Sequence, residues 1–306
     1  MEKKPYTSLN AYYRSLFGRK IAKISLDGGF TCPNRDGTLG RRGCLFCSAG
    51  GSGDFAENAS LSITEQISRG KAQTADKWPD AAYIAYFQAF TNTYAPVEEL
   101  RRRYEEALAC PDVAGLSIAT RADCLPEEVL DLLEELSCRT RLWVELGFQT
   151  AKEETAQRIR RGYGNHVFEG AVRALDERKI PVIAHVILGL PGESREDMLH
   201  TIDYLNGLPI QGVKLQLLHV PADSDLAPLY QSGQYTPLTK EDYITLLGDC
   251  IARLRPDIVL HRLTGDGDKT TLLAPLWSLH KRDVLNSIHR SLRERGIFQG
   301  KDFTEA

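Results

Sequence analysis

The chain has 306 residues, a formal net charge of −3, and a composition that is 42% hydrophobic and 26% charged. These values predict a globular protein with a sizeable core, and they argue against a disordered chain and against a strongly basic nucleic-acid binder. No apolar run reaches the roughly 18 residues of a membrane span, and residues 1–5 precede no apolar secretory stretch, so we expect a cytoplasmic protein without a membrane partner.

Short apolar runs alternate with segments of helical periodicity as far as residue 218. The runs predict buried strands at 22–26, 82–87, 116–119, 142–146, 182–188 and 213–218. The segments between them predict helices at 63–75, 97–109, 127–136, 167–179 and 195–205. Repeated strand–helix units imply a parallel sheet, and right-handed crossovers curl such a sheet toward a barrel. We therefore predict an α/β fold with a partial (β/α)6, TIM-like barrel.

The C-terminal part has a different pattern. It predicts a helix at 239–254 that Thr239 caps, one more strand at 258–263, and an amphipathic helix at 283–295. We expect residues 1–225 to form the barrel core and residues 226–306 to form a C-terminal α/β extension packed on the barrel.

The cysteines fall into two groups. Their total is seven, an odd number, and no secretory context is expected, so structural disulfides are not predicted. Four are scattered and are interpreted as small buried hydrophobic residues, namely Cys110, Cys124, Cys138 and Cys250. The other three lie within sixteen residues: eleven residues separate Cys32 from Cys44, and two separate Cys44 from Cys47.

Three cysteines at this spacing can bind an iron–sulfur cluster or a zinc ion. Thiolates are the usual cluster ligands, and three of them on four irons leave one iron open. A structural zinc site requires four ligands, and the first histidine in the sequence, His166, is far from the cysteines. The spacing favours the iron–sulfur cluster and leaves zinc as the alternative.

This motif, with Phe46 before the last cysteine, resembles the radical S-adenosylmethionine (SAM) superfamily. The long first gap is similar to the branch near the Elongator catalytic subunit. Residues 32–38 and 43–47 resemble a compact bacterial family in that branch, grouped with the tRNA wobble-uridine modification enzyme MnmL. The resemblance implies that Cys32, Cys44 and Cys47 hold a [4Fe–4S] cluster. It also implies that the enzyme reductively cleaves SAM at that cluster to give a 5′-deoxyadenosyl radical.

The same resemblance implies cofactor-binding residues at the strand ends, where parallel α/β folds carry their chemistry. Glu145 is a carboxylate inside an apolar strand, which is costly unless it is paired; it would meet the cofactor or, alternatively, form a structural ion pair. Thr120 would contact ribose, and Arg161 would clamp the cofactor carboxylate. The apolar-flanked His185 is interpreted as a core histidine. The remaining cofactor-binding candidates are Gln88, Asn92, Gln149, Gly189 and His219.

For the substrate, the resemblance implies tRNA, whose carboxymethylaminomethyl group on wobble uridine would be converted to aminomethyl. It also implies an electron donor such as flavodoxin or ferredoxin. One alternative is a radical SAM enzyme that acts on a small metabolite, which the acidic net charge favours. The other is a zinc-stabilised, non-catalytic RNA-binding module. Candidate RNA contacts are Arg41, Arg42, Tyr94, Lys281, Arg282 and Arg290.

Overall fold

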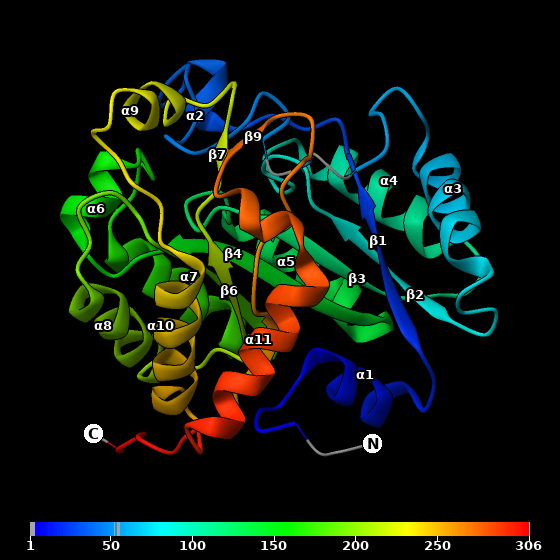
Figure 1. Ribbon diagram of the computed structural model, residues 1–306. Helices are drawn as coiled ribbons and strands as arrows, with labels where there is room; N and C mark the ends of the chain where they lie inside the picture. Colours follow the sequence, from blue (N-terminus) through cyan, green and yellow to red (C-terminus); the bar gives the residue numbers. More distant parts are fainter. Residues whose placement is uncertain (1–3, 52, 54–55, 306) are drawn as a thin grey trace.

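The computed structural model describes residues 4–51, 53 and 56–305, and a curled parallel sheet dominates this part of the chain (Figure 1). Its seven described strands follow the order β1-β2-β3-β4-β5-β6-β8. The strands are β1 (Ile21–Leu26), β2 (Ala82–Phe87), β3 (Val113–Thr120), β4 (Arg141–Gln149), β5 (Val182–Leu188), β6 (Gly212–Leu217) and β8 (Val259–Arg262). A short antiparallel pair, β7 (Val220–Pro221) and β9 (Leu272–Ala274), lies outside this sheet.

Helices connect and cover the strands. They are α1 (Leu9–Phe17), α2 (Pro33–Asp36), α3 (Ile63–Ala75), α4 (Val97–Leu108), α5 (Glu127–Arg139), α6 (Glu153–Arg158), α7 (Asn165–Glu177), α8 (Arg195–Asn206), α9 (Ala227–Gln231), α10 (Lys240–Arg253), the 3-10 helix η1 (Leu276–Leu279) and α11 (Lys281–Glu294). Among the described residues, no helix combines the length and the apolar character that a bilayer crossing requires.

The sheet confirms the predicted fold class, a half-barrel of parallel strands with helices on its outer face. The predicted strand at 258–263 corresponds to β8, which pairs in parallel with β6 and so extends the sheet beyond six strands. Figure 1 shows α2, β7 and β9 at one end of the molecule and both chain termini at the other. The boundary at residue 225 stays a prediction, because β8 and α10 both contact the barrel.

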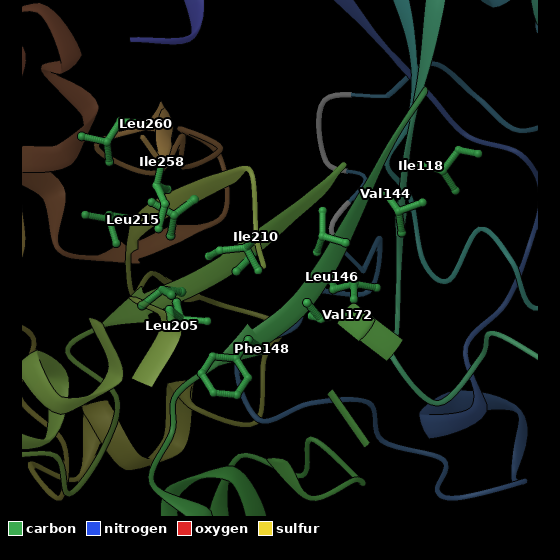
Figure 2. Close-up of a cluster of buried hydrophobic side chains, with 14 of the residues drawn as sticks. Ile118, Val144, Leu146, Phe148, Val172, Leu205, Ile210, Leu215, Ile258 and Leu260 are labelled. Carbon is green, nitrogen blue, oxygen red and sulfur yellow. The ribbon is translucent and has the colours of Figure 1, made fainter. Parts of the chain in front are cut away.

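Successive side chains of each strand point to opposite faces of the sheet, and both faces are buried. Val144, Leu146 and Phe148 of β4 point to the outer face, where Val172 of α7 lies in the same buried cluster (Figure 2). The residues between them point into the half-barrel, because successive side chains in a strand face opposite sides. All six residues of β2 are buried for the same reason.

The interior of the half-barrel is layered. Tyr13 of α1 lies against Trp143 at the amino ends of the strands, with ring centroids 5.4 Å apart. Helix α1, which the sequence analysis did not predict, contacts both edge strands, β1 and β8. Above this apolar base lies Glu145, and above Glu145 lie Gly147 and Gln149 at the carboxyl end of β4. The chemistry-bearing side chains therefore gather in the upper layers.

The core on the outer face can be tested through Leu133 of α5, whose side chain is fully buried. We expect Leu133→Ala to lower the free energy of unfolding by about 2–5 kcal/mol, because it removes buried apolar atoms and leaves a cavity. Denaturant unfolding followed by circular dichroism measures this change. The matched control is Leu39→Ala at a 53% exposed leucine, for which we expect less than about 0.5 kcal/mol. Equal effects would contradict the assigned core.

Candidate active site

A cavity opens at the carboxyl ends of the strands, between the sheet and the loop that follows β1. Cys32, Cys44 and Cys47 all line this cavity. They come from the loop between β1 and α3, as the motif predicts. The fold therefore brings the three clustered thiols to one place, at the edge of the sheet where parallel α/β proteins carry their active sites.

Local contacts explain how the loop holds this position. Cys32 is the N-cap of α2, with Pro33 in the first turn. The Asn34 amide donates to the backbone oxygen of Arg160 over 2.7 Å, and the Arg160 Nε donates to the Gly43 oxygen over 2.9 Å. Gly43 has φ 71°, and a Cβ there would lie 3.0 Å from Arg35 Nε. A glycine is therefore required where the loop turns beside Cys44.

The surroundings of Cys44 favour its thiolate, the form that binds iron. A hydrogen bond with Cys47 lowers the pKa of Cys44 to about 6, and the charges of Arg121 and Arg160 act in the same direction. The same hydrogen bond, together with burial, raises the pKa of Cys47. The Asn34 Nδ2 lies 3.5 Å from Cys44 Sγ and donates toward it.

The donor set fits an iron–sulfur cluster better than a single metal ion. Among residues 4–51, 53 and 56–305, no three His, Cys, Asp or Glu side chains are placed to hold one ion. In a cubane cluster each thiolate binds a different iron, so the thiols need only surround a common volume. We propose Cys32, Cys44 and Cys47 as the cluster ligands, which leaves one iron without a protein ligand.

Most of the predicted cofactor-binding residues lie around the same cavity. Those that line it are Gln88, Thr120, Glu145, Gln149, Arg161 and His219. His219 Nε2 is buried and has no hydrogen-bond partner within the described part of the chain. Burial lowers the pKa of His219 to about 4, which keeps this ring neutral at pH 7.

Two predicted residues lie outside the cavity lining. Asn92 is fully buried, and its amide donates to the Phe87 and Ala119 backbone oxygens, which fixes the turn after β2 against β3. Gly189 has φ 91°, and its oxygen accepts a hydrogen bond from Tyr235 over 2.9 Å. The contacts described are structural, and a cofactor contact of either residue stays a prediction.

Glu145 is the most strongly bonded predicted residue. Its carboxylate is fully buried and lies 2.6 Å from Lys23 Nζ, 2.6 Å from His185 Nε2 and 2.6 Å from Ser117 Oγ, and it also pairs with Lys214. Burial raises the pKa of Glu145, but the opposite effect of the two lysines and His185 is larger. The net pKa therefore lies well below its ordinary value. These contacts are those of a structural ion pair inside the barrel, the alternative role considered for Glu145. Glu145 also lines the cavity.

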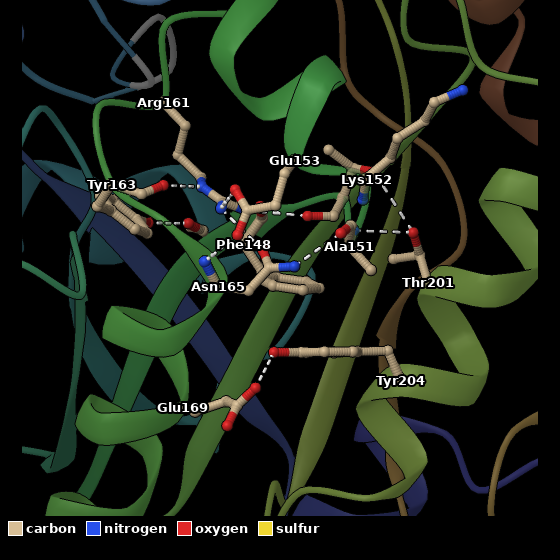
Figure 3. Close-up of polar contacts among 12 residues, drawn as sticks. Phe148, Ala151, Lys152, Glu153, Arg161, Tyr163, Asn165, Glu169, Thr201 and Tyr204 are labelled. Carbon is tan, nitrogen blue, oxygen red and sulfur yellow. Dashed lines mark hydrogen bonds and ion pairs between the residues drawn. The ribbon is translucent and has the colours of Figure 1, made fainter.

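Arg161 is buried, and its guanidinium is fully used by the protein (Figure 3). Its N–H groups donate to the backbone oxygens of Phe148, Thr150 and Tyr163 and to the side chains of Glu153 and Asn165. Because every donor is engaged, the clamp on the cofactor carboxylate that the sequence suggested would require Arg161 to give up an existing hydrogen bond. Arg121 also lines the cavity and pairs with Asp123 over 2.7 Å. Its charge lowers the pKa of the Cys44 thiol.

Sequence reasoning missed several polar residues of the inner wall. His185, interpreted as a core histidine, lines the cavity and bonds to Glu145. Lys23 and Lys214 carry charges inside apolar strands, the same signal that singled out Glu145. Arg262 at the end of β8 also lines the cavity. The two lysines could have been identified as charged residues within apolar strands, whereas Arg262 ends the short edge strand β8 and gave no comparable signal.

A parallel half-barrel with a three-cysteine loop over its carboxyl edge defines a radical SAM type of protein. The family model of the radical SAM superfamily matches residues 37–205, and that of the radical SAM C-terminal domain matches residues 210–294. The chain belongs to the radical SAM superfamily. It is an enzyme of that superfamily, and its cofactors are a [4Fe–4S] cluster and SAM.

Relatives and solved structures agree with this family. The chain is 46% identical over 300 residues to the uncharacterized protein YtqA of Bacillus subtilis, covering 98% of this chain and 93% of YtqA. It is 37% identical over 282 residues to protein YhcC of Escherichia coli, covering 92% of this chain and 90% of YhcC. The solved Elp3 of Methanocaldococcus infernus has a TM-score of 0.70 at 15% identity. That alignment covers 91% of this chain and 64% of the Elp3 chain, and it supports the fold.

The proposed ligand set predicts the outcome of a cysteine substitution. We expect Cys44→Ala to lose most of the bound iron after anaerobic reconstitution, because two thiolates hold a cluster poorly. Iron analysis and visible absorbance measure the loss. The control is Cys138→Ala: the interpretation of Cys138 as buried is wrong, since it is exposed on α5, and this variant should keep its iron. Full iron retention by Cys44→Ala would refute the ligand set.

The ion pairs of Glu145 predict a change in stability. We expect Glu145→Gln to cost about 3–5 kcal/mol at pH 7, because it removes the anion that pairs with the buried Lys214 and the partly buried Lys23. The lowered pKa of Glu145 stabilises the fold above the unfolded-state pKa of about 4.3, and this stabilisation is lost as the pH falls toward the folded-state pKa. The gap between wild type and Glu145→Gln should therefore narrow below about pH 4.3.

Denaturant titrations between pH 3 and 8 measure this gap. Glu177→Gln, at an exposed carboxylate of α7, serves as the matched control, with an expected change within about 0.5 kcal/mol. If Glu145→Gln behaves like Glu177→Gln, or if its deficit grows in acid, the carboxylate is not the stabilising anion described here.

Proposed function

We propose that this enzyme modifies tRNA, converting the carboxymethylaminomethyl group of wobble uridine to aminomethyl. An electron donor such as flavodoxin or ferredoxin would reduce the cluster. When bound, the cluster and SAM supply radical chemistry, and the protein positions the substrate and excludes water from the cavity.

The observation that carries this proposal is the motif at residues 32–38 and 43–47, which resembles a tRNA wobble-uridine family. The solved Elp3 supports it at the level of the fold alone. The relatives with the higher identities, YtqA and YhcC, cover nearly the whole chain.

The charges beside the cavity support an anionic substrate. Another cavity, here called the side cavity, adjoins the first and shares Gln88, Arg262 and Asp266 with it. Lys269 and Lys281 line the side cavity, so three cationic groups face one carboxylate there. Lys281 was a candidate RNA contact in the sequence. Cationic side chains of this kind bind RNA phosphates and make the affinity sensitive to salt.

Mass spectrometry of wobble nucleosides tests the proposal. Reconstituted protein, a reductant and SAM are incubated with tRNA that carries carboxymethylaminomethyluridine. We expect this nucleoside to decline and aminomethyluridine to rise, and we expect tRNA binding to weaken as the salt concentration increases.

Cys44→Ala serves as the cluster-deficient control, which should leave the nucleosides unchanged. If wild-type protein cleaves SAM but leaves the tRNA unchanged, the tRNA proposal is wrong. The net charge of −3 would then favour the alternative, a radical SAM enzyme acting on a small metabolite.

A further inference from the structure

Arg262 stands at the junction of the two cavities. It is the last residue of β8, at the edge of the sheet opposite β1. It lines the cofactor cavity together with His185 and Gln216, and it lines the side cavity together with Ser25 and Lys269. A ligand in either cavity is therefore within reach of Arg262.

The guanidinium of Arg262 has unused hydrogen-bond donors. Its NH2 lies 3.5 Å from Asp266 Oδ2, and within the described residues it donates no hydrogen bond. Asp266 is shared, because its Oδ1 accepts a hydrogen bond from Lys281 over 2.5 Å. A planar guanidinium with free donors facing a cavity matches the two oxygens of a carboxylate.

The charged groups inside the half-barrel do not neutralise the charge of Arg262. The buried carboxylate of Glu145 already pairs with both Lys23 and Lys214. Burial lowers the pKa of Lys214 to about 7, and the charge of Arg262 acts in the same direction. Lys214 and Arg262 are also adjacent in the paired strands. The lining of the cofactor cavity holds more arginine side chains than carboxylates, which favours an anion on the ligand.

We propose that Arg262 binds the carboxylate of the substrate's carboxymethyl group and thereby selects substrate over product. This assignment rests on the proposed function, in which the substrate carries a carboxylate that the aminomethyl product lacks. The Arg262 side chain is 31% exposed and lies beside Lys214 in the paired strands, so a side group of a base that inserts into the cavity can reach it. The same cationic wall repels the ammonium group of the product and favours its release.

Arg262→Gln and Arg262→Lys test the assignment in reconstituted holoenzyme. We expect Arg262→Gln to lower kcat/KM for the carboxymethylaminomethyl tRNA by about 10- to 100-fold, mainly through KM, because a charged hydrogen bond is lost. Arg262→Lys keeps the charge and should recover part of that loss. Arg253→Gln, on the outer helix α10 and paired with Asp203, is the matched surface control.

A second measurement separates binding from a structural role. Filter binding gives the ratio of dissociation constants for tRNA with carboxymethylaminomethyl and with aminomethyl uridine. We expect wild type and Arg253→Gln to prefer the substrate, and we expect Arg262→Gln to lose that preference. If Arg262→Gln keeps both its KM and its preference, the assignment is overturned. Iron content and thermal midpoint check the folding of each variant, and Arg262→Lys replaces Arg262→Gln if the latter does not fold.

A small probe keeps this test independent of tRNA. Sarcosine carries the same carboxymethylamine group, and calorimetry measures its binding to reconstituted protein with SAM. Binding by wild type that Arg262→Gln abolishes supports the carboxylate site even if tRNA proves not to be the substrate. Equal sarcosine binding by both proteins, no binding by wild type, or equal competition by inorganic phosphate would reject the assignment.

Discussion

The loop that carries the thiols can face the cavity only because the segment around Arg160 holds it against the edge of the sheet. Asn34 donates to the Arg160 backbone, and Arg160 donates back to the Gly43 backbone and pairs with Asp225 over 2.5 Å. The two hydrogen bonds with the loop join residues 126 and 117 positions apart in the sequence, and Asp225 also pairs with Arg42 of the loop over 2.9 Å. The position of Cys44 therefore depends on the folded barrel and not on the loop alone.

Beneath the thiols, Glu145 and its partners separate an apolar base from the polar cavity. A buried ion pair costs desolvation energy and is a weak source of stability, so the stabilisation of the barrel comes mainly from its apolar layers. Glu145 and its partners instead determine the positions of polar side chains in the half-barrel. They place His185 beside the cavity with Nε2 bonded to Glu145, and Arg262 lines the same cavity.

The barrel was predictable because its strands are buried on both faces and its helices carry regular apolar spacing. Helix 63–75 and strand 182–188 match the observed α3 and β5 residue for residue. The short elements α1, β7 and β9 were missed, because tertiary packing and not local pattern defines them. The cysteine spacing located the site. It could not show that Arg161 donates its hydrogen bonds to backbone oxygens, because those contacts follow from the three-dimensional path of the turn after β4.

The central claim is that three thiols hold a four-iron cluster whose fourth iron is open to SAM. Mössbauer spectroscopy of protein reconstituted with iron-57 tests this most directly. The account predicts that adding SAM changes the signal of one iron in four while the other three stay alike. A spectrum that SAM leaves unchanged, or a protein that binds zinc in place of iron under these conditions, would contradict it.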